Sequence, residues 1–264
     1  MRITQSVAAA LALAALAAPL AAQARRDRPT LVFTISGVYR DGVGLWTVPD
    51  QPVQDNTNGT LTDHFFLNRS VNRSLGAGFS GTYYRGAHLG LSAEAFLVGL
   101  GYDDTCRLVA PAQSELNAER CNSIDKLDRS AAAVALSTGV VYRVGSDEFI
   151  SPFIRGHVGV LVNNQSPLLL IGETNNGAEL VIYDDQNTGT RLRPAVLLGL
   201  GATVAAGRGY QLRWEIRDNI LGIQRVTGPA ARGTVPPYET AYKHIFSLNI
   251  GLDVILERRP GRRY

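Results

Sequence analysis

The sequence predicts an all-β protein: a closed antiparallel β-barrel of about eight transmembrane strands with up-and-down topology. Three observations predict this fold. The chain begins with an apolar segment typical of export. Beyond it, segments of about 10–15 residues alternate apolar with small or polar residues, which is the period of a β-strand. Short and long connections then alternate along the chain, as they do when short turns lie on one side of a membrane and long loops on the other.

The first residues have the anatomy of a secretory signal peptide. Arg2 provides the positive start, Val7 to Ala18 form an uninterrupted apolar run, and small residues at Ala22 and Ala24 suit a cleavage position. The run is shorter than the roughly 20 apolar residues that a membrane-spanning helix needs. We therefore expect cleavage near Ala24. The expected organisation is a signal peptide over 1–24, an outer-membrane barrel over 25–256 and a short basic periplasmic tail over 257–264.

Strands are expected where the alternation is clearest. In the last of them every second residue from Tyr242 to Leu256 is apolar except His244, and Lys243 and Asp253 lie on the other face. The same period recurs in seven earlier segments. The expected strands cover residues 31–44, 71–84, 88–102, 128–143, 150–162, 191–206, 210–223 and 242–256.

The connections support the barrel more strongly than any single strand does. Three are tight: 85–87, 145–148 and 207–209. Four are long and rich in Asn, Asp, Gly, Pro and Thr, and we expect simple solvated loops there: 45–70, 103–127, 163–190 and 224–241. An even number of strands places both termini on the same side, which is the periplasmic side if the short turns lie there.

A water-soluble antiparallel barrel such as a lipocalin is the structural rival, because there the apolar face points inward. The charged strand face includes Arg213, Glu215 and Arg217, and the alternation alone does not say which face is inside. The export segment and the long loops at one end favour the membrane. Aromatic residues near strand ends are then expected in interfacial girdles: Tyr84, Tyr102, Tyr142, Phe153, Tyr210 and Tyr242.

The C-terminal strand reads Asn249-Ile250-Gly251-Leu252-Asp253-Val254-Ile255-Leu256: polar, any residue, Gly, two of any residue, apolar, any residue, apolar. In this pattern it resembles the C-terminal strand of the small outer-membrane barrel proteins of the OmpA/OmpX and OmpW type. Leu212 to Asp218 are also similar to the charged seventh strand common in that family. Family members usually end on an aromatic residue, whereas Glu257 to Arg263 separate this strand from Tyr264. The residues that match the family's assembly signal are Asn249, Gly251, Val254 and Leu256.

This resemblance implies a bacterial outer-membrane location and recognition by the barrel-assembly machinery. The partners expected with it are outer-membrane lipid and lipopolysaccharide, with a small solute as a further possibility. No nucleic acid is expected as a partner. Nucleic-acid binding requires a clustered basic face, and the net charge of +3 is too small to indicate one. The sequence leaves the oligomeric state open.

The candidate site is the charged face of the strands. Eight strands leave an interior that side chains nearly fill, so pairing Arg155 and Arg217 with two glutamates would plug the lumen. This predicts a structural or surface-interaction role. The alternative is a narrow channel or lateral pathway for small solutes, with the same charges as a selectivity ring. The expected lumenal cluster comprises Glu94, Arg155, His157, Arg213, Glu215 and Arg217.

A lipid-modifying enzyme of the outer membrane is a third possibility. His157 would be its base, with Glu94 or Glu215 to orient it and Ser92 or Ser247 as the nucleophile. No G-x-S-x-G motif surrounds either serine. We therefore expect no enzymatic activity, no cofactor and no metal site.

The long connections carry two further signals. Cys106 and Cys121 lie in one polar segment, and an even cysteine count in an exported chain predicts a disulfide between them. The segment 103–128 and the pair Asp184-Asp185 are acidic, which suits a divalent cation beside lipopolysaccharide. Solvated loops are the preferred interpretation of the acidic segment 103–128 and of the pair Asp184-Asp185.

Overall fold

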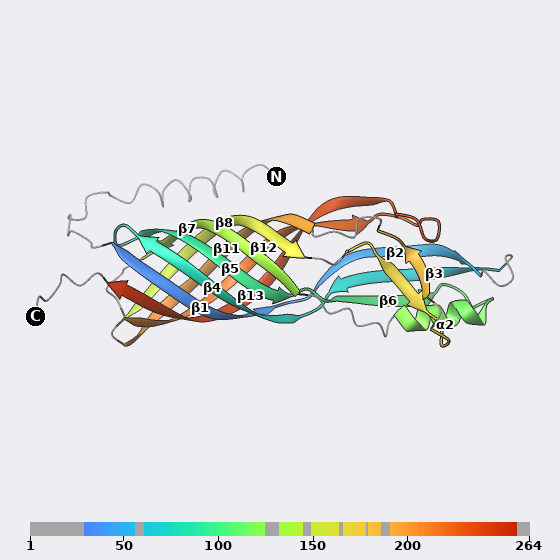
Figure 1. Ribbon diagram of the computed structural model, residues 1–264, viewed down its shortest axis with the longest axis horizontal. Helices are drawn as coiled ribbons and strands as arrows, with labels where there is room; N and C mark the ends of the chain where they lie inside the picture. The colour runs from blue at the N-terminus through green and yellow to red at the C-terminus, as the bar shows by residue number, and fades with distance from the viewer. Residues whose placement is uncertain are drawn as a thin grey trace, which may run out of the picture.

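The computed structural model describes residues 29–55, 61–124, 132–144, 149–163, 166–177, 179–185, 191–207 and 209–257. Eight strands close into one antiparallel barrel, which confirms the predicted fold class (Figure 1). Their order round the barrel is β1 (Thr30–Arg40), β13 (Tyr238–Glu257), β12 (Tyr210–Val226), β11 (Arg191–Gly207), β8 (Ile150–Asn163), β7 (Ala132–Arg143), β5 (Leu89–Gly99) and β4 (Ser74–Tyr84).

The strand register determines how narrow the barrel is. The pairing followed once round the sheet from Arg40 returns to β1 at Thr30, ten residues lower. A stagger of this kind tilts the strands by about 35–45° and leaves an interior that side chains fill. Closure also pairs both edges of the sheet, so that the barrel presents no free edge where it is closed.

The apolar face of every barrel strand points outward, so the soluble-barrel alternative is wrong. On β13, for example, Ile250 is 54% exposed whereas its neighbours Asn249 and Gly251 are buried. The same alternation exposes Leu91 on β5 and Leu200 on β11. A continuous apolar band of this kind is not normally left facing water.

The aromatic residues divide by the same alternation. Tyr142, Tyr210 and Tyr242 are exposed on the outer face, as the girdle prediction requires. The prediction is wrong for three others, which are buried because they occupy inward positions or lie outside the barrel: Tyr84, Phe153 and Tyr102.

The long connections are folded, and the prediction of simple solvated loops is wrong. Their described residues form a three-stranded sheet, β2–β3–β6, a two-stranded sheet, β9–β10, and the helix α2. We call these elements and residues 227–237 the loop module. Its elements are β2 (Val43–Gln54), β3 (Thr62–Val71), β6 (Tyr102–Leu108), α2 (Glu115–Ile124), β9 (Leu170–Glu173) and β10 (Glu179–Tyr183).

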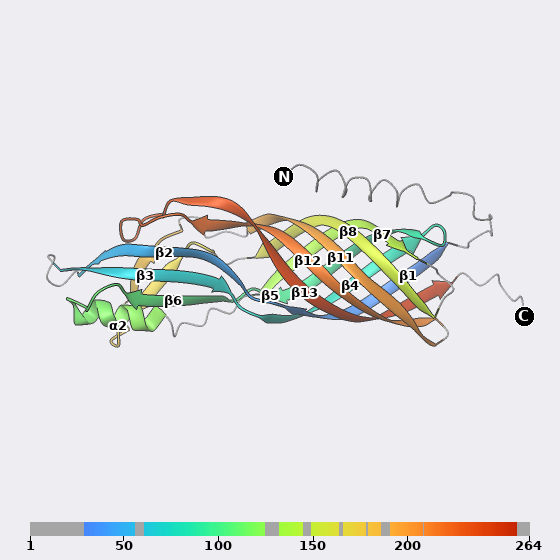
Figure 2. The ribbon, with the colours of Figure 1, turned by 180° about the vertical axis from the view of Figure 1, so that it is seen from behind.

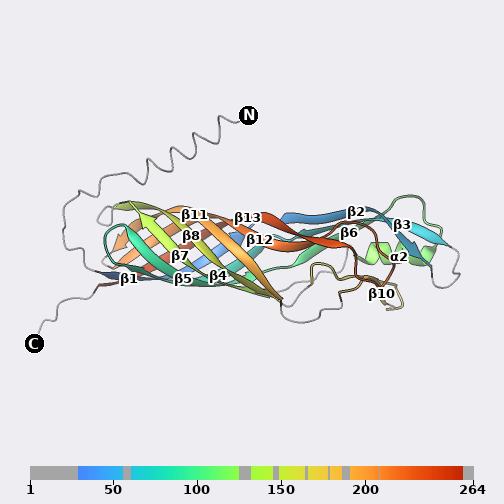
Figure 3. The same ribbon diagram turned by 90° about the horizontal axis from the view of Figure 1, so that it is seen from above.

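The loop module grows directly out of the barrel. Only two residues separate β1 from β2, and two separate β3 from β4 and β5 from β6. Figure 2 shows the β12–β13 ribbon running past the barrel beside β2, and Figure 3 shows β10 and α2 at the same end. β1 begins and β13 ends at the opposite end of the barrel.

One apolar core joins the two parts. We call the part of the lumen nearer the loop module the upper lumen. The core contains Val38, Phe96 and Leu197 there, and it continues through Leu67 and Ile182 in the loop module. The barrel is therefore capped by packed side chains at the end from which the loop module extends.

Several predictions fall outside the described residues: the signal peptide of 1–24, the tail beyond 257 and the turn at 145–148. In the part of the chain that is described, no helix has the length and apolar character needed to cross a membrane.

Candidate functional site: barrel lumen and loop module

All six charged residues of the predicted cluster point into the lumen and are buried. Their exposed fractions range from 1% for Glu215 to 7% for Arg155. They come from β5, β8 and β12, three strands that are far apart in sequence. Inward positions on these strands carry charge because the outward positions carry the apolar residues.

Four of these residues form a closed ring of ion pairs. Arg217 Nη1 donates to Glu94 Oε1 at 2.8 Å, and Arg217 Nε donates to Glu215 Oε1 at 3.0 Å. Arg155 Nη1 donates to Glu215 Oε2 at 3.2 Å, and its Nη2 donates to Glu94. Each guanidinium therefore contacts both carboxylates, and the ring is neutral overall. Such pairing is what makes charge tolerable in a low-dielectric interior.

The ring fits closely against the backbone of β11. A Cβ atom placed on Gly199 would overlap the Glu215 carboxylate and lie 2.8 Å from Arg155 Cγ. Glycine at this position therefore leaves the space that the ring occupies.

His157 contacts the ring directly, with its Nε2 3.0 Å from Arg155 Nη2, and also through Ser137, a residue that the sequence did not single out. Ser137 Oγ lies 3.2 Å from His157 Nδ1 and donates to Glu94 Oε1 at 3.0 Å. His157 Nδ1 is 3.8 Å from the same carboxylate oxygen. Serine and glutamate thus both face one nitrogen of the imidazole, which is not the relay geometry of a hydrolase, where they face opposite nitrogens.

The two serines considered as nucleophiles have other partners. Ser92 Oγ accepts a hydrogen bond from Thr82 at 3.0 Å, and Ser247 Oγ accepts one from Asn219 Nδ2 at 3.0 Å. Neither contacts His157. The arrangement described here supports a hydrogen-bonded filling of the lumen and provides no nucleophile–base pair from the residues predicted.

Arg213 does not join the ring and forms a separate pair nearer the end of the barrel where β1 begins. Its Nε donates to both oxygens of Asp253, at 3.0 and 3.1 Å, and Thr34 Oγ1 donates to the same carboxylate at 2.7 Å. The guanidinium also stacks 4.6 Å from the centre of the Phe153 ring. Below the ion-pair ring, the lumen is thus filled by a second neutral pair on an apolar floor.

A hollow remains at this end, lined by residues that include Tyr84, Gln211 and Asp253. Its volume is about 10 Å³, which suffices for about one water molecule.

In the loop module, Arg69 holds three connections together. Its guanidinium binds Asp104 of β6 through Nε at 2.5 Å and Nη2 at 2.6 Å. The same group donates to the carbonyls of Pro167 and Leu169 at 2.9 and 2.8 Å. The side chain is fully buried, and it lies 5.3 Å from the Trp46 ring centre.

Gln51 ties the last connection to β2. Its amide donates to the Ala230 carbonyl at 2.8 Å and accepts from the Ala230 amide at 3.0 Å. Tyr183 OH donates to Gln51 Oε1 at 2.7 Å. Burial raises the pKa of the Tyr183 hydroxyl, so this donor remains protonated.

Asp63 anchors the start of α2. Its carboxylate accepts from the backbone amides of Gln113 and Ser114 at 2.7 and 3.2 Å and from Asn117 Nδ2 at 2.9 Å. Ser114 is the N-cap, because its hydroxyl accepts from the Asn117 amide at 3.4 Å. Asp63, Phe65, Leu67 and Arg69 are all buried at every second position of β3. This period-2 signal was available in the sequence and could have identified the strand.

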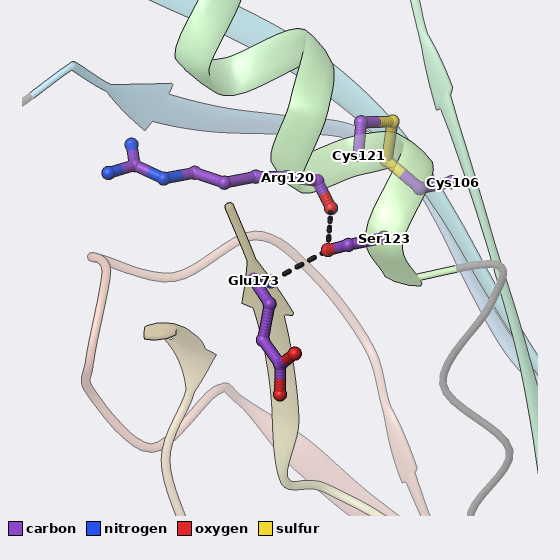
Figure 4. Close-up of a disulfide and its surroundings, with 5 residues drawn as sticks. All are labelled: Cys106, Arg120, Cys121, Ser123 and Glu173. Atoms are coloured by element: carbon purple, nitrogen blue, oxygen red, sulfur yellow. Dashed lines mark hydrogen bonds between the residues drawn. A yellow bond between two sulfur atoms is a disulfide. The ribbon is translucent and has the colours of Figure 1, made fainter. Parts of the chain in front are cut away.

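The structure contains the predicted disulfide between Cys106 of β6 and Cys121 of α2. Figure 4 shows Ser123 beside it, joining the helix to β9: its hydroxyl donates to the Arg120 carbonyl at 2.7 Å and accepts from the Glu173 amide at 2.6 Å. The connection that contains β6 and α2 is thereby joined to two others. It is joined to the first connection because β6 pairs with β3, and to the third because Ser123 binds β9.

The acidic residues of the connections do not gather into a cation site in the described residues. Asp104 binds Arg69, and Asp185 binds Arg191 and Ser166. No group of three or more His, Cys, Asp or Glu side chains in the described part of the chain is placed to hold a metal ion.

The residues of the expected assembly signal all lie in β13, the strand that closes the barrel against β1. Asn249 and Gly251 face the lumen, whereas Leu256 is exposed on the outer face. Val254 is half-buried.

No protein-family model matches the sequence, and no curated protein matches it. Solved structures similar to the chain include Neisserial surface protein A, with a TM-score of 0.42, 9% identity, and coverage of 85% of this chain and 96% of that one. Another is Ail of Yersinia pestis, solved with a heparin analogue (0.42, 8%, 87% and 99%). A third is the outer membrane protein AlkL in lipid bilayers (0.46, 13%, 93% and 98%). TM-scores this low add nothing to the barrel topology that the strand pairing establishes.

Proposed function

We propose that the chain is a bacterial outer-membrane protein with a structural or surface-interaction role, in which a sealed barrel holds the loop module outside the cell. The observation that carries the proposal is the neutral ring of Arg155, Arg217, Glu94 and Glu215 in the lumen. It fills the barrel with paired charge instead of leaving a hydrated pathway. A selectivity ring would need charges that face water and a permeating solute.

The outer surface supports the membrane location. Apolar side chains face outward on all eight barrel strands, and closure satisfies the backbone hydrogen bonds that lipid cannot. The expected signal peptide supplies the export route. We further propose outer-membrane lipid and lipopolysaccharide as the surroundings of this surface, and the barrel-assembly machinery as the partner that reads β13 during biogenesis.

The loop module supports the surface role. Simple loops would not need Arg69, Gln51 and Asp63 buried as cross-links between connections. These contacts hold the module in one shape, and a fixed shape lowers the entropy lost when a surface binds a partner. A non-catalytic role is part of the proposal.

Cysteine labelling of intact cells tests this orientation. Both native cysteines are in the disulfide, so Ala231→Cys in the loop module and Arg85→Cys in the β4–β5 turn each introduce a single free thiol. A membrane-impermeant maleimide should label the Ala231→Cys protein on intact cells. It should label the Arg85→Cys protein only after the outer membrane is permeabilised. Labelling of the turn in intact cells, or of neither site, would contradict the proposal.

A further inference from the structure

Arg40 is a buried cation for which the described residues provide no counterion. It is the last residue of β1, its side chain faces the lumen, and it is 4% exposed. Its Nε and Nη1 atoms are buried and make no hydrogen bond. Arg40 forms no ion pair with any residue that the structure describes, in contrast to Arg155, Arg213 and Arg217 below it.

Among the described residues of the lumen, no carboxylate offsets the charge of Arg40. Besides Arg193, the buried charged groups of the described lumen include the guanidinium groups of Arg40, Arg155, Arg213 and Arg217, and the carboxylates of Glu94, Glu215 and Asp253. Each carboxylate is already bound by one or more of the lower three arginines. Arg193, nearer the loop module, has partners of its own. Arg40 is therefore the guanidinium of this set that no carboxylate binds, and an uncompensated buried charge is costly.

A second unpartnered donor lies beside Arg40. Ser74 on β4 is its partner in the strand register, faces the lumen, and has a buried hydroxyl without a hydrogen bond. On the other side, Arg40 is in register with Ser247 of β13. Arg40 and Ser74 therefore place a guanidinium and a hydroxyl on the same inward face of neighbouring strands, and such groups are donors that bind an anion.

We propose that the upper lumen binds one small monovalent anion of the halide class between the Arg40 guanidinium and the Ser74 hydroxyl. A water molecule would accept hydrogen bonds from the N–H groups but would leave the positive charge uncompensated. A halide ion would accept the hydrogen bonds and also neutralise the charge. Val38, which shares the inward face of β1 with Arg40, belongs to the packed apolar core, and such packing around the guanidinium favours a small anion over a large one.

Bromide dependence of stability tests the proposal. The protein refolded in detergent is heated in sodium bromide or in sodium gluconate at equal ionic strength, and the unfolding midpoint is followed. Bromide should raise the midpoint by about 2–4 °C once its concentration is several times the dissociation constant, and the effect should saturate. Arg40→Gln should abolish the difference between the salts. Arg73→Gln, at an exposed arginine of the same barrel end, should preserve it.

An unmodified protein with equal midpoints in the two salts would overturn the proposal, as would an Arg40→Gln variant that keeps the bromide effect. If Arg40→Gln does not fold, anomalous diffraction from unmodified crystals soaked in bromide decides. A bromide peak within hydrogen-bond distance of Arg40 supports the site, and bromide peaks found only elsewhere contradict it.

Discussion

Each guanidinium of the ion-pair ring contacts two carboxylates, so removal of one carboxylate affects two cations at once. Glu215 binds both Arg155 and Arg217 and is 1% exposed. A buried partner left without compensation costs about 3–5 kcal/mol. An exposed pair such as Arg225–Glu239 contributes only about 0–1 kcal/mol.

We therefore expect Glu215→Ala to lower the temperature of the heat-induced shift in gel migration markedly, because Arg155 and Arg217 lose half of their compensation. Glu239→Ala, the control, should leave that temperature within a few degrees of the unmodified protein. If Glu215→Ala and Glu239→Ala change the temperature of the gel shift by the same amount, the ring does not stabilise the barrel.

Gly199 gives a steric prediction at the same scale. Gly199→Ala should destabilise the barrel by about 1–3 kcal/mol, since its Cβ would overlap the Glu215 carboxylate. Gly37→Ala on β1 has no atom within 4 Å of the new Cβ and serves as the control. Denaturant titration of both refolded variants measures the difference. Equal unfolding midpoints would show that the ring leaves spare room beside β11.

The alternation in the sequence was enough to predict which residues share the charged face. It was not enough to predict which of these side chains form ion pairs with each other, because the pairing depends on the stagger between strands. Arg213 was grouped with the ring but pairs with Asp253, and Ser137 was overlooked although it contacts both His157 and Glu94. A register error of two residues on one strand would exchange such partners.

At the scale of elements, the eight barrel strands were predicted to within a few residues, because each is a long alternating segment between turn signals. The alternation of β3 was available, but β2 is interrupted by Gly44, Pro49 and Pro52, and β6, β9 and β10 have only seven, four and five residues. The register of β2 is also irregular. β2 pairs with β3 through two such shifts. α2 was missed because its buried residues include Asn117 and Arg120, so its sequence has no apolar stripe.

Arg69 is the element-scale test of the loop module. Arg69→Ala should loosen the segment 166–170 on β3, because the carbonyls of Ser166, Pro167 and Leu169 each lose a hydrogen bond from Arg69, although the Pro167 carbonyl keeps the one from Trp46 Nε1. Hydrogen exchange of that segment should accelerate at least tenfold while exchange in the barrel strands stays unchanged. Arg107→Ala, an exposed arginine on β6, is the control. Unchanged exchange at 166–170 in the Arg69 variant would contradict the role assigned to it.

The disulfide should stabilise the module and not the barrel. It closes a loop of 15 residues between β6 and α2, worth about 3 kcal/mol in the chain-entropy model. Reduction should therefore speed proteolysis within 102–124 and leave the heat-induced gel shift intact. The Cys106→Ser, Cys121→Ser double variant should reproduce this result and no longer respond to reductant. Loss of the gel shift on reduction would show that the barrel also depends on the bridge.

At the scale of the whole molecule, the lumen is a stack of layers from one mouth to the other. An apolar floor with the Arg213–Asp253 pair is followed by the ion-pair ring, then by the apolar core that runs into the loop module. The outward apolar face and the closed sheet were readable from the sequence. The cap was not, because it forms only when four connections that are distant in sequence meet.

The most direct test of the sealed lumen is single-channel recording of the refolded protein in a planar bilayer, with a heat-modifiability gel to verify that the barrel has folded. The layered lumen predicts a heat-dependent shift in migration together with no openings above the bilayer background. Discrete, reproducible openings from protein that shows the gel shift would contradict the seal and favour a narrow channel for small solutes.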